Sequence, residues 1–332
     1  MRNSFFRSCH KISEKSGWLG VLFTLISFHP PDAGAQSTPS NPTDRPILSV
    51  YLPDYRVKNG DETPQLYGAS HLVIFSGKPH EDGRVDFSRI TSALLAFAEN
   101  ARRDKDLVVT LCVGGWGRGK EFATAVSSAE SRSRFVEDLV NFCAEHHLDG
   151  VDIDWEFPKG DREHADFALF LAELSEKLHA DDRILTAALG YTRPLTEECW
   201  RSLDRVNLMS YQPWSEQPYE PWLRESIERF LAAGLPPEKL LLGIGFYAKE
   251  KAGERRAVSW RQLVAENSAG LPDSEHGYWP VGTEACDLRL RLVKEYGLGG
   301  ITIWDYGHDS PIPEKSLLRY LATGLGRYEV TE

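Results

Sequence analysis

Carboxylates crowd into one short stretch of the chain, the segment 149–156 (DGVDIDWE), where Asp152, Asp154 and Glu156 alternate with apolar residues. Successive side chains of a β-strand point to opposite faces, so the three acids share one face of a predicted strand. Like charges gathered this closely are costly unless something uses or neutralises them. The pattern therefore favours a catalytic site over a solvated edge strand, and the positions of Gly and Glu do not fit an EF-hand calcium loop.

Eight strand candidates, most of them separated by segments with helical periodicity, form the framework around this stretch. They are 47–52, 71–76, 107–113, 149–156, 184–189, 206–211, 240–247 and 300–304. Eight alternating β and α units predict a single-domain (β/α)8 TIM barrel. A doubly wound sheet is the alternative, but no Gly-rich phosphate loop follows the first strand. The connection 248–282 is too short for a folded domain, so no sizeable insertion is expected between strands seven and eight.

Helical patterning predicts the elements between these strands. The expected helices are 88–103, 128–146, 161–179, 221–233, 259–266, 287–296 and 314–323. Asp86 or Ser88 is expected to cap the first of them.

The carboxyl ends of the strands form the site in a barrel of this kind. The predicted rim holds Tyr51, Phe75, Gly114, Gly115, Trp116, Glu156, Tyr211, Tyr247 and Trp304. Flat aromatic faces pack against sugar rings, so the collection suits a carbohydrate, although each aromatic taken singly could be a core residue. Glu156 is the acid nearest this rim and the candidate proton donor. Asp149 is off the parity of the other acids and is assigned structural support at the start of the strand.

Composition and the N-terminus narrow the class of protein further. The formal net charge of −11 argues against nucleic acid and anionic membranes as partners. A basic start, the apolar run 17–28 and Ala33-Gly34-Ala35 predict a signal peptide over 1–35 that is cleaved near Ala35, with a membrane anchor as the alternative. We expect a linker at 36–45, a catalytic domain at 46–328, and a secreted or periplasmic protein that leaves the membrane after cleavage.

Metal and cysteine chemistry find little support in the sequence. Of five cysteines, Cys9 is removed with the signal peptide, and Cys112, Cys143, Cys199 and Cys286 are too scattered for a metal site. Buried isolated thiols are expected, with one disulfide left open for an exported protein. No metal and no cofactor is expected.

Several segments together resemble glycoside hydrolase family 18, the chitinases and their relatives. The stretch 149–156 matches the family signature DGxDxDxE at every position. Gly114-Gly115 resembles the SxGG motif, and Met209-Ser210-Tyr211 resembles M-x-Y. The segments 243–247 and 299–304 resemble the last two strands. Two positions depart from the family pattern. Cys112 replaces the SxGG serine, which predicts the loss of a hydrogen bond to the carboxylates. Gln212 stands where many members carry Asp, which bears on sugar contacts and the pH profile.

The resemblance implies hydrolysis of β-1,4-linked N-acetylglucosamine chains such as chitin, with net retention, by a monomer. Glu156 would be the general acid/base, while the 2-acetamido oxygen of the substrate attacks and forms an oxazolinium ion. Asp154 would orient the acetamido group, Asp152 would share a proton with it, and Tyr211 would donate to the acetamido oxygen. Trp304 would form the floor under the sugar. Further sugar contacts are expected from Tyr51, Phe75, Trp116, Gln212 and Tyr247, with Gly114, Gly115 and Asp149 as structural support.

Three other functions stay open at this point. An endo-β-N-acetylglucosaminidase acting on N-glycans or cell-wall glycans would use the same chemistry. A chitin-binding lectin on the same barrel would typically lack the acid at the position of Glu156. A metal-dependent polysaccharide deacetylase would need a His/Asp cluster at ligand spacing, which the sequence does not offer.

Overall fold

The structure of the protein is a computed structural model that describes residues 45–57, 64–103, 106–252, 254, 256–266 and 277–329. The expected signal peptide lies outside the described residues, as does the expected linker apart from Arg45. Within the described ranges, no helix has the length and apolar character needed to cross a membrane.

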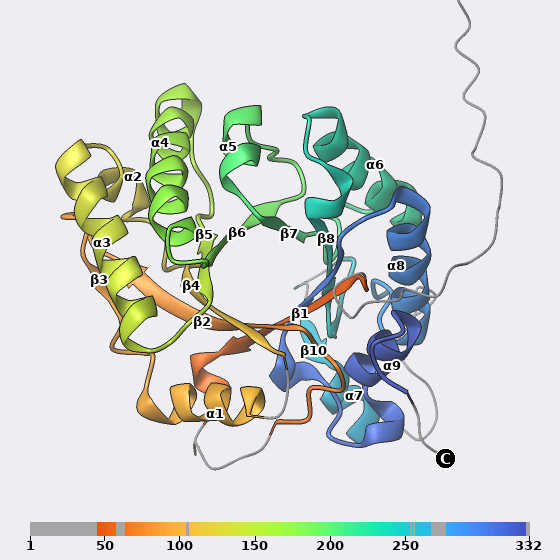
Figure 1. Ribbon diagram of the computed structural model, residues 1–332. Helices are drawn as coiled ribbons and strands as arrows, with labels where there is room; N and C mark the ends of the chain where they lie inside the picture. The colour runs from red at the N-terminus through yellow and green to blue at the C-terminus, as the bar shows by residue number, and fades with distance from the viewer. Residues whose placement is uncertain are drawn as a thin grey trace, which may run out of the picture. The chain divides into compact units, whose positions relative to one another are not determined.

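Eight parallel strands close into a barrel, as predicted (Figure 1). In chain order they are β1 (Ile47–Pro53), β2 (His71–Pro79), β4 (Val108–Gly114), β5 (Gly150–Asp154), β6 (Ile184–Gly190), β7 (Arg205–Met209), β8 (Leu240–Gly245) and β11 (Gly300–Trp304). Strand β1 pairs with both β2 and β11, which closes the ring. The short β3 (Val85–Asp86) adds to β2 in the antiparallel sense. The strands read as apolar runs because both of their faces are covered.

Helices surround the barrel in the described part of the chain (Figure 1). They are α1 (Ser92–Arg102), α2 (Phe122–Ala125), α3 (Ala129–Glu145), α4 (Gly160–His179), α5 (Glu197–Ser202), α6 (Tyr219–Ala232), α7 (Trp260–Glu266), α8 (Thr283–Tyr296) and α9 (Leu317–Gly324). The predicted cap of α1 was wrong. Thr91 caps this helix and accepts from the Leu94 amide at 3.2 Å, while Asp86 accepts from the Ser88 amide in the preceding turn. Helices α2 and α5 were not predicted because they are too short to show a helical periodicity in the sequence.

The connection between β8 and β11 carries no sizeable domain, as predicted. Its described residues form the antiparallel pair of β9 (Tyr247–Lys249) and β10 (Ala257–Ser259), together with α7 and α8.

The apolar side chains form two clusters of different size. The large cluster fills the space between the strands and the surrounding helices. A small one consists of Tyr51, Val73, Phe75 and Cys112, with Trp304 packed against it. The four cysteines that the structure describes, Cys112, Cys143, Cys199 and Cys286, are free and buried, so the predicted thiols are confirmed.

Candidate active site

Strand β5 places the acidic residues at two different depths. The strand ends at Asp154, so it is shorter than the predicted 149–156 and Glu156 lies on the turn beyond it. Asp152 is fully buried, Asp154 is 4% exposed and Glu156 is partly buried. The three carboxyl groups therefore run from the interior of the barrel towards its carboxyl-end rim.

Asp152 is held by donors from four neighbouring strands. Its Oδ2 accepts from the Tyr51 hydroxyl at 2.7 Å. Its Oδ1 accepts from the Thr186 hydroxyl at 2.5 Å and from the Asn207 amide at 2.9 Å. The Cys112 thiol adds a further hydrogen bond. Burial still raises the pKa of Asp152, although these bonds lower it. The expectation that Cys112 costs a hydrogen bond was wrong, because strand register sets Cys112 beside Asp152 and the thiol donates.

Asp154 is the least satisfied of the three acids. Its Oδ1 is buried and has no hydrogen-bond partner within the part of the chain that the structure describes. Desolvation first, then the charges of Glu156 and Asp152, raise its pKa well above the usual range. An acidic oxygen that is buried without a partner is suited to accept a hydrogen bond from a ligand.

Glu156 has the proton affinity of an acid that works near neutral pH. Burial raises its pKa to about 7, and a hydrogen bond from the Trp116 backbone amide acts in the opposite direction. A carboxyl group with a pKa near 7 can donate a proton and take it back at neutral pH.

Two glycines at the carboxyl end of β4 allow the backbone to approach Asp154. Gly114 and Gly115 have φ of +100° and +94°. A Cβ on Gly114 would lie 2.2 Å from the Asp154 carbonyl oxygen, and one on Gly115 would lie 2.3 Å from the Phe75 ring. The Gly115 amide donates to the Asp154 carbonyl at 2.7 Å. Larger residues at these two positions would push against the end of β5, which carries the acids.

Three aromatic rings form a connected floor near the acids. Trp304 lies edge-on to Phe75 with ring centroids 4.8 Å apart, and its ring lies 5.6 Å from that of Tyr51. The peptide bonds that follow Phe75, Glu156 and Trp304 are cis. Trp116 differs from these rings because it is 75% exposed at the mouth.

Tyr211 and Tyr247 follow the ends of β7 and β8, and they form one side of the site. Their ring centroids are 6.4 Å apart. Burial, the Tyr247 hydroxyl and the three acids raise the pKa of Tyr211, so this hydroxyl keeps its proton and can donate it. Gln212 hydrogen-bonds the Tyr247 hydroxyl. Burial raises the pKa of Tyr247 to about 12.

A cavity of about 580 Å³ brings most of the predicted residues together. Its lining includes Tyr51, Phe75, Trp116, Asp154, Glu156, Tyr211, Gln212, Tyr247 and Trp304. Among the lining residues that sequence reasoning missed are Tyr55, Arg118, Phe157, Tyr191, Trp214 and Lys249. Each lies within a few residues of a strand's carboxyl end, so extending the search into the loops would have found them.

Arg118, itself part of this lining, connects three strand ends. Its guanidinium donates to the Asp54 carboxylate at 3.1 Å and to the Ser76 hydroxyl at 3.0 Å. The guanidinium also lies over the Phe75 ring at 5.1 Å. Arg118 thus fixes the loops after β1 and β4 relative to each other and to β2.

Asp149 lies at the other end of β5, away from the cavity. Its Oδ2 accepts from the Val109 amide at 2.7 Å and forms an ion pair with Arg102. These contacts join α1, β4 and β5 at the amino end of the barrel, which agrees with the predicted structural support.

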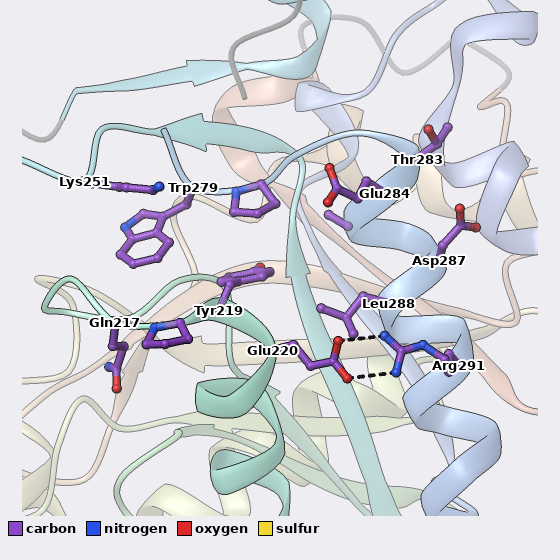
Figure 2. A pocket seen from close by; sticks show the side chains of 13 residues that line it. Gln217, Tyr219, Glu220, Lys251, Trp279, Thr283, Glu284, Asp287, Leu288 and Arg291 are labelled. Carbon is purple, nitrogen blue, oxygen red and sulfur yellow. Dashed lines mark hydrogen bonds and ion pairs between the residues drawn. The ribbon is translucent and has the colours of Figure 1, made fainter. Parts of the chain in front are cut away.

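A second cavity of about 740 Å³ lies where α6 meets α8 (Figure 2). Its lining carries more charged side chains, among them Glu220, Asp287 and Arg291. Glu220 accepts two 2.8 Å hydrogen bonds from Arg291. These bonds lower the pKa of Glu220 to about 2, so it stays ionised. Asp287 accepts from the Tyr320 hydroxyl. The proton-donor chemistry is therefore assigned to the barrel, where burial raises the pKa of Glu156 to about 7.

Within the described residues, no group of three or more His, Cys, Asp or Glu side chains could hold a metal ion.

Comparison with known proteins agrees with this geometry. The family model described as "Glycosyl hydrolases family 18" matches residues 47–309. The chain belongs to glycosyl hydrolase family 18. A relative from Drosophila melanogaster named "Probable chitinase 2" is 32% identical over 175 residues, covering 45% of this chain and 36% of that protein. The chain therefore spans about a third of the length of that family 18 relative.

Solved structures of the family share the barrel. The chitinase ChiB of Flavobacterium johnsoniae superposes with a TM-score of 0.69 at 22% identity, covering 85% of this chain and 94% of that one. Human YKL-39, described as a pseudo-chitinase with retained chitooligosaccharide binding, gives 0.70 at 18% identity, covering 85% and 100%. The same fold thus occurs in a protein named a chitinase and in one described as a pseudo-chitinase, and at these identities the likeness shows the fold alone.

Proposed function

We propose that this protein is a chitinase-like glycoside hydrolase that cleaves β-1,4-linked N-acetylglucosamine polymers or oligomers with retention of configuration. The observation that carries the proposal is the row of carboxyl groups Asp152, Asp154 and Glu156, with the pKa of Glu156 raised to about 7, beside an aromatic-lined cavity of about 580 Å³. Membership of family 18 and the chitinase names of its relatives support a glycoside hydrolase.

The first half of the reaction breaks the glycosidic bond. Glu156 donates its proton to the leaving oxygen as the bond to the anomeric carbon breaks. The 2-acetamido oxygen of the same sugar attacks that carbon and forms an oxazolinium ion. The partnerless Asp154 Oδ1 is suited to accept the acetamido N–H. Tyr211 donates to the acetamido oxygen, and Trp304 supports the sugar ring.

The second half returns the site to its starting state. The Glu156 carboxylate takes a proton from water, whose oxygen attacks the anomeric carbon and reopens the oxazolinium ring. The positive charge of the oxazolinium ion, which Asp154 balanced, disappears in this step. Asp154 then takes up the proton that it shares with Asp152. Two inversions at one carbon give net retention, and no enzyme carboxylate bonds to the sugar.

The decisive experiment is mass spectrometry of the products from N-acetylglucosamine oligomers, with cellulose oligomers and fully deacetylated chitosan as controls. We expect cleavage of the acetylated chains alone. Glu156→Gln should lose at least ~10²–10⁴-fold in kcat. Comparable turnover of cellulose oligomers, or full activity of Glu156→Gln, would contradict the mechanism. A high-mannose glycopeptide in the same assay tests endo-β-N-acetylglucosaminidase activity.

A sugar-binding protein without turnover is the second candidate, favoured by the structural likeness to YKL-39. The presence of Glu156, with its raised pKa, argues for turnover instead. Calorimetric binding of the oligomers by the wild-type protein with no products after prolonged incubation would favour the lectin.

We further propose that the mature protein is a secreted or periplasmic monomer that begins after Ala35. The sequence pattern of residues 1–35 supports export, and the free buried thiols leave the monomer without a disulfide among the described cysteines. Intact mass of the protein recovered from the medium or periplasm, together with gel filtration, tests both statements.

A further inference from the structure

Arg289 on α8 is a cation buried where no acid compensates it. Its side chain is fully buried, and among the described residues no carboxylate forms an ion pair with it. Its donors go instead to the carbonyls of Gly243 at 3.0 Å, Ser210 at 3.0 Å and Ala285 at 3.2 Å, and to the Tyr219 hydroxyl at 2.7 Å. Burying a guanidinium is unfavourable unless its hydrogen bonds are satisfied, so a packing role alone explains the presence of Arg289 poorly.

The acceptors of Arg289 lie where the pairing between two barrel strands stops. The ladder between β7 and β8 ends at Leu208 and Leu242. The carbonyls of Ser210 and Gly243 lie just beyond this last pair. Arg289 spans both of them, and the Ser210 hydroxyl also reaches the Gly243 carbonyl at 3.4 Å. The guanidinium thus replaces the missing strand pairing at the carboxyl ends of β7 and β8.

Tyr219 links Arg289 to the backbone of Tyr211. Its hydroxyl accepts from Arg289 and donates to the carbonyl oxygen of Tyr211 at 2.9 Å. The guanidinium also lies over the Tyr219 ring at 5.4 Å. Tyr219 itself lines the second cavity and stacks on Trp279 with ring centroids 6.0 Å apart (Figure 2). Two consecutive carbonyls, of Ser210 and Tyr211, are therefore held from outside the barrel.

We propose that Arg289 and Tyr219 are positioning residues for Tyr211, holding the backbone of residues 210–211 so that the Tyr211 hydroxyl meets the acetamido group of the substrate. The proposal rests on the proposed function for the role of that hydroxyl. Neither residue lines the cavity that contains Asp154 and Glu156. Both act through the carbonyls that they bind.

Tyr219→Phe tests this with the least disturbance, because it keeps the stacked ring and removes only the hydroxyl. We expect kcat on N-acetylglucosamine oligomers to fall about tenfold with a smaller rise in KM, since a misplaced Tyr211 weakens a contact that forms with the bound sugar and matters most in the transition state. In a Tyr211→Phe background the same substitution should change kcat by less than about twofold. Equal losses in both backgrounds, or no loss in the wild-type background, would overturn the proposal.

Tyr296→Phe is the matched control. The Tyr296 hydroxyl also bonds an arginine and an acceptor, Arg224 and Glu228, but on the outer surface of the protein. It should leave kcat unchanged, so a merely structural effect of losing a tyrosine hydroxyl would appear here too. Arg289→Lys keeps the charge but cannot reach all four acceptors, and it should lower kcat more than Tyr219→Phe. An Arg289→Lys protein that folds with wild-type kcat contradicts the proposal.

A binding measurement separates this proposal from the proposed function. In a Glu156→Gln background, calorimetry with N-acetylglucosamine oligomers should show that Tyr219→Phe and Tyr211→Phe each weaken binding and that their effects do not add. If the wild-type protein binds but does not cleave, the proposed function fails while this cycle still decides the positioning role. Additive effects would remove the link between Tyr219 and Tyr211.

Discussion

At the scale of single residues, burial sets the proton affinities that the proposed chemistry needs. Asp152 keeps four donors and its pKa rises moderately, whereas Asp154 has a partnerless oxygen and its pKa rises further. Glu156, at the rim, has a pKa of about 7. Strand β5 and the turn after it thus offer three different proton affinities, because each acid has a different degree of burial and a different set of donors.

The raised pKa of Glu156 predicts the alkaline side of the pH profile. The general acid must carry its proton, and the protonated fraction falls about tenfold for each pH unit above the pKa. Activity should therefore be highest below about pH 7 and kcat/KM should decline above it, when measured on N-acetylglucosamine oligomers from pH 4 to 10. A kcat/KM that still rises above pH 8 would exclude Glu156 as the acid with this pKa.

At the scale of elements, the loops after the strands decide where the acids point. The turn after β4 approaches the end of β5 so closely that only glycine fits, and Arg118 joins the loops after β1 and β4 to the end of β2. The site is therefore built by contacts between neighbouring strand ends, and β5 alone would not hold Glu156 in place.

The close approach at Gly114 predicts a large effect from one added methyl group. In Gly114→Ala the new Cβ would meet the Asp154 carbonyl at 2.2 Å, and the backbone has φ of +100°. The free energy of unfolding should fall by more than about 2 kcal/mol, and kcat should fall with it, because the acids must shift.

Gly117→Ala provides the control for this experiment in urea denaturation. Gly117 has φ of +76°, but nothing lies within 4 Å of an added Cβ. It should lose about 1 kcal/mol from backbone strain alone. Equal losses for both variants would show that strain, not the contact with β5, limits the turn.

At the scale of the whole molecule, the barrel closes through contacts between chain segments that are remote in sequence. Strand β1 pairs with β11, and the end of the chain after α9 returns to the start of β1. Arg327 donates to the Gly68 carbonyl at 3.0 Å and to the Pro46 carbonyl at 3.1 Å. This closure lies at the amino ends of the strands, opposite the site, so stability and chemistry are assigned to different ends of the barrel.

Arg327→Ala should therefore destabilise the protein without altering the reaction. Two carbonyls lose a charged donor, and the free energy of unfolding should fall by about 1–3 kcal/mol. Arg229→Ala, which removes an exposed ion pair with Glu225 on α6, should cost less than about 0.5 kcal/mol. Thermal unfolding measures both, and kcat should stay unchanged. A changed kcat in Arg327→Ala would show that the two ends of the barrel are coupled.

The sequence by itself determined the barrel, the strand that carries the acids and part of the cavity lining. Strands covered on both faces leave continuous apolar runs, and alternation places Asp152 and Asp154 on one face, so both are readable without coordinates. The cap of α1 and the end of β5 were misjudged because hydrogen bonds to single side chains and turns set them, and such bonds leave no periodic pattern.

Only the tertiary structure decided what surrounds each acid. The Cys112 thiol donates to Asp152 because β4 and β5 pair in register, and Arg118 reaches Asp54 because the loops after β1 and β4 meet. Arg289 is read from the sequence as one more charge on a helix, yet it lies fully buried against carbonyls of β7 and β8. The physical reason is common to all three. Burial and hydrogen bonding depend on neighbours brought together by barrel closure, and residue type and spacing do not encode those neighbours.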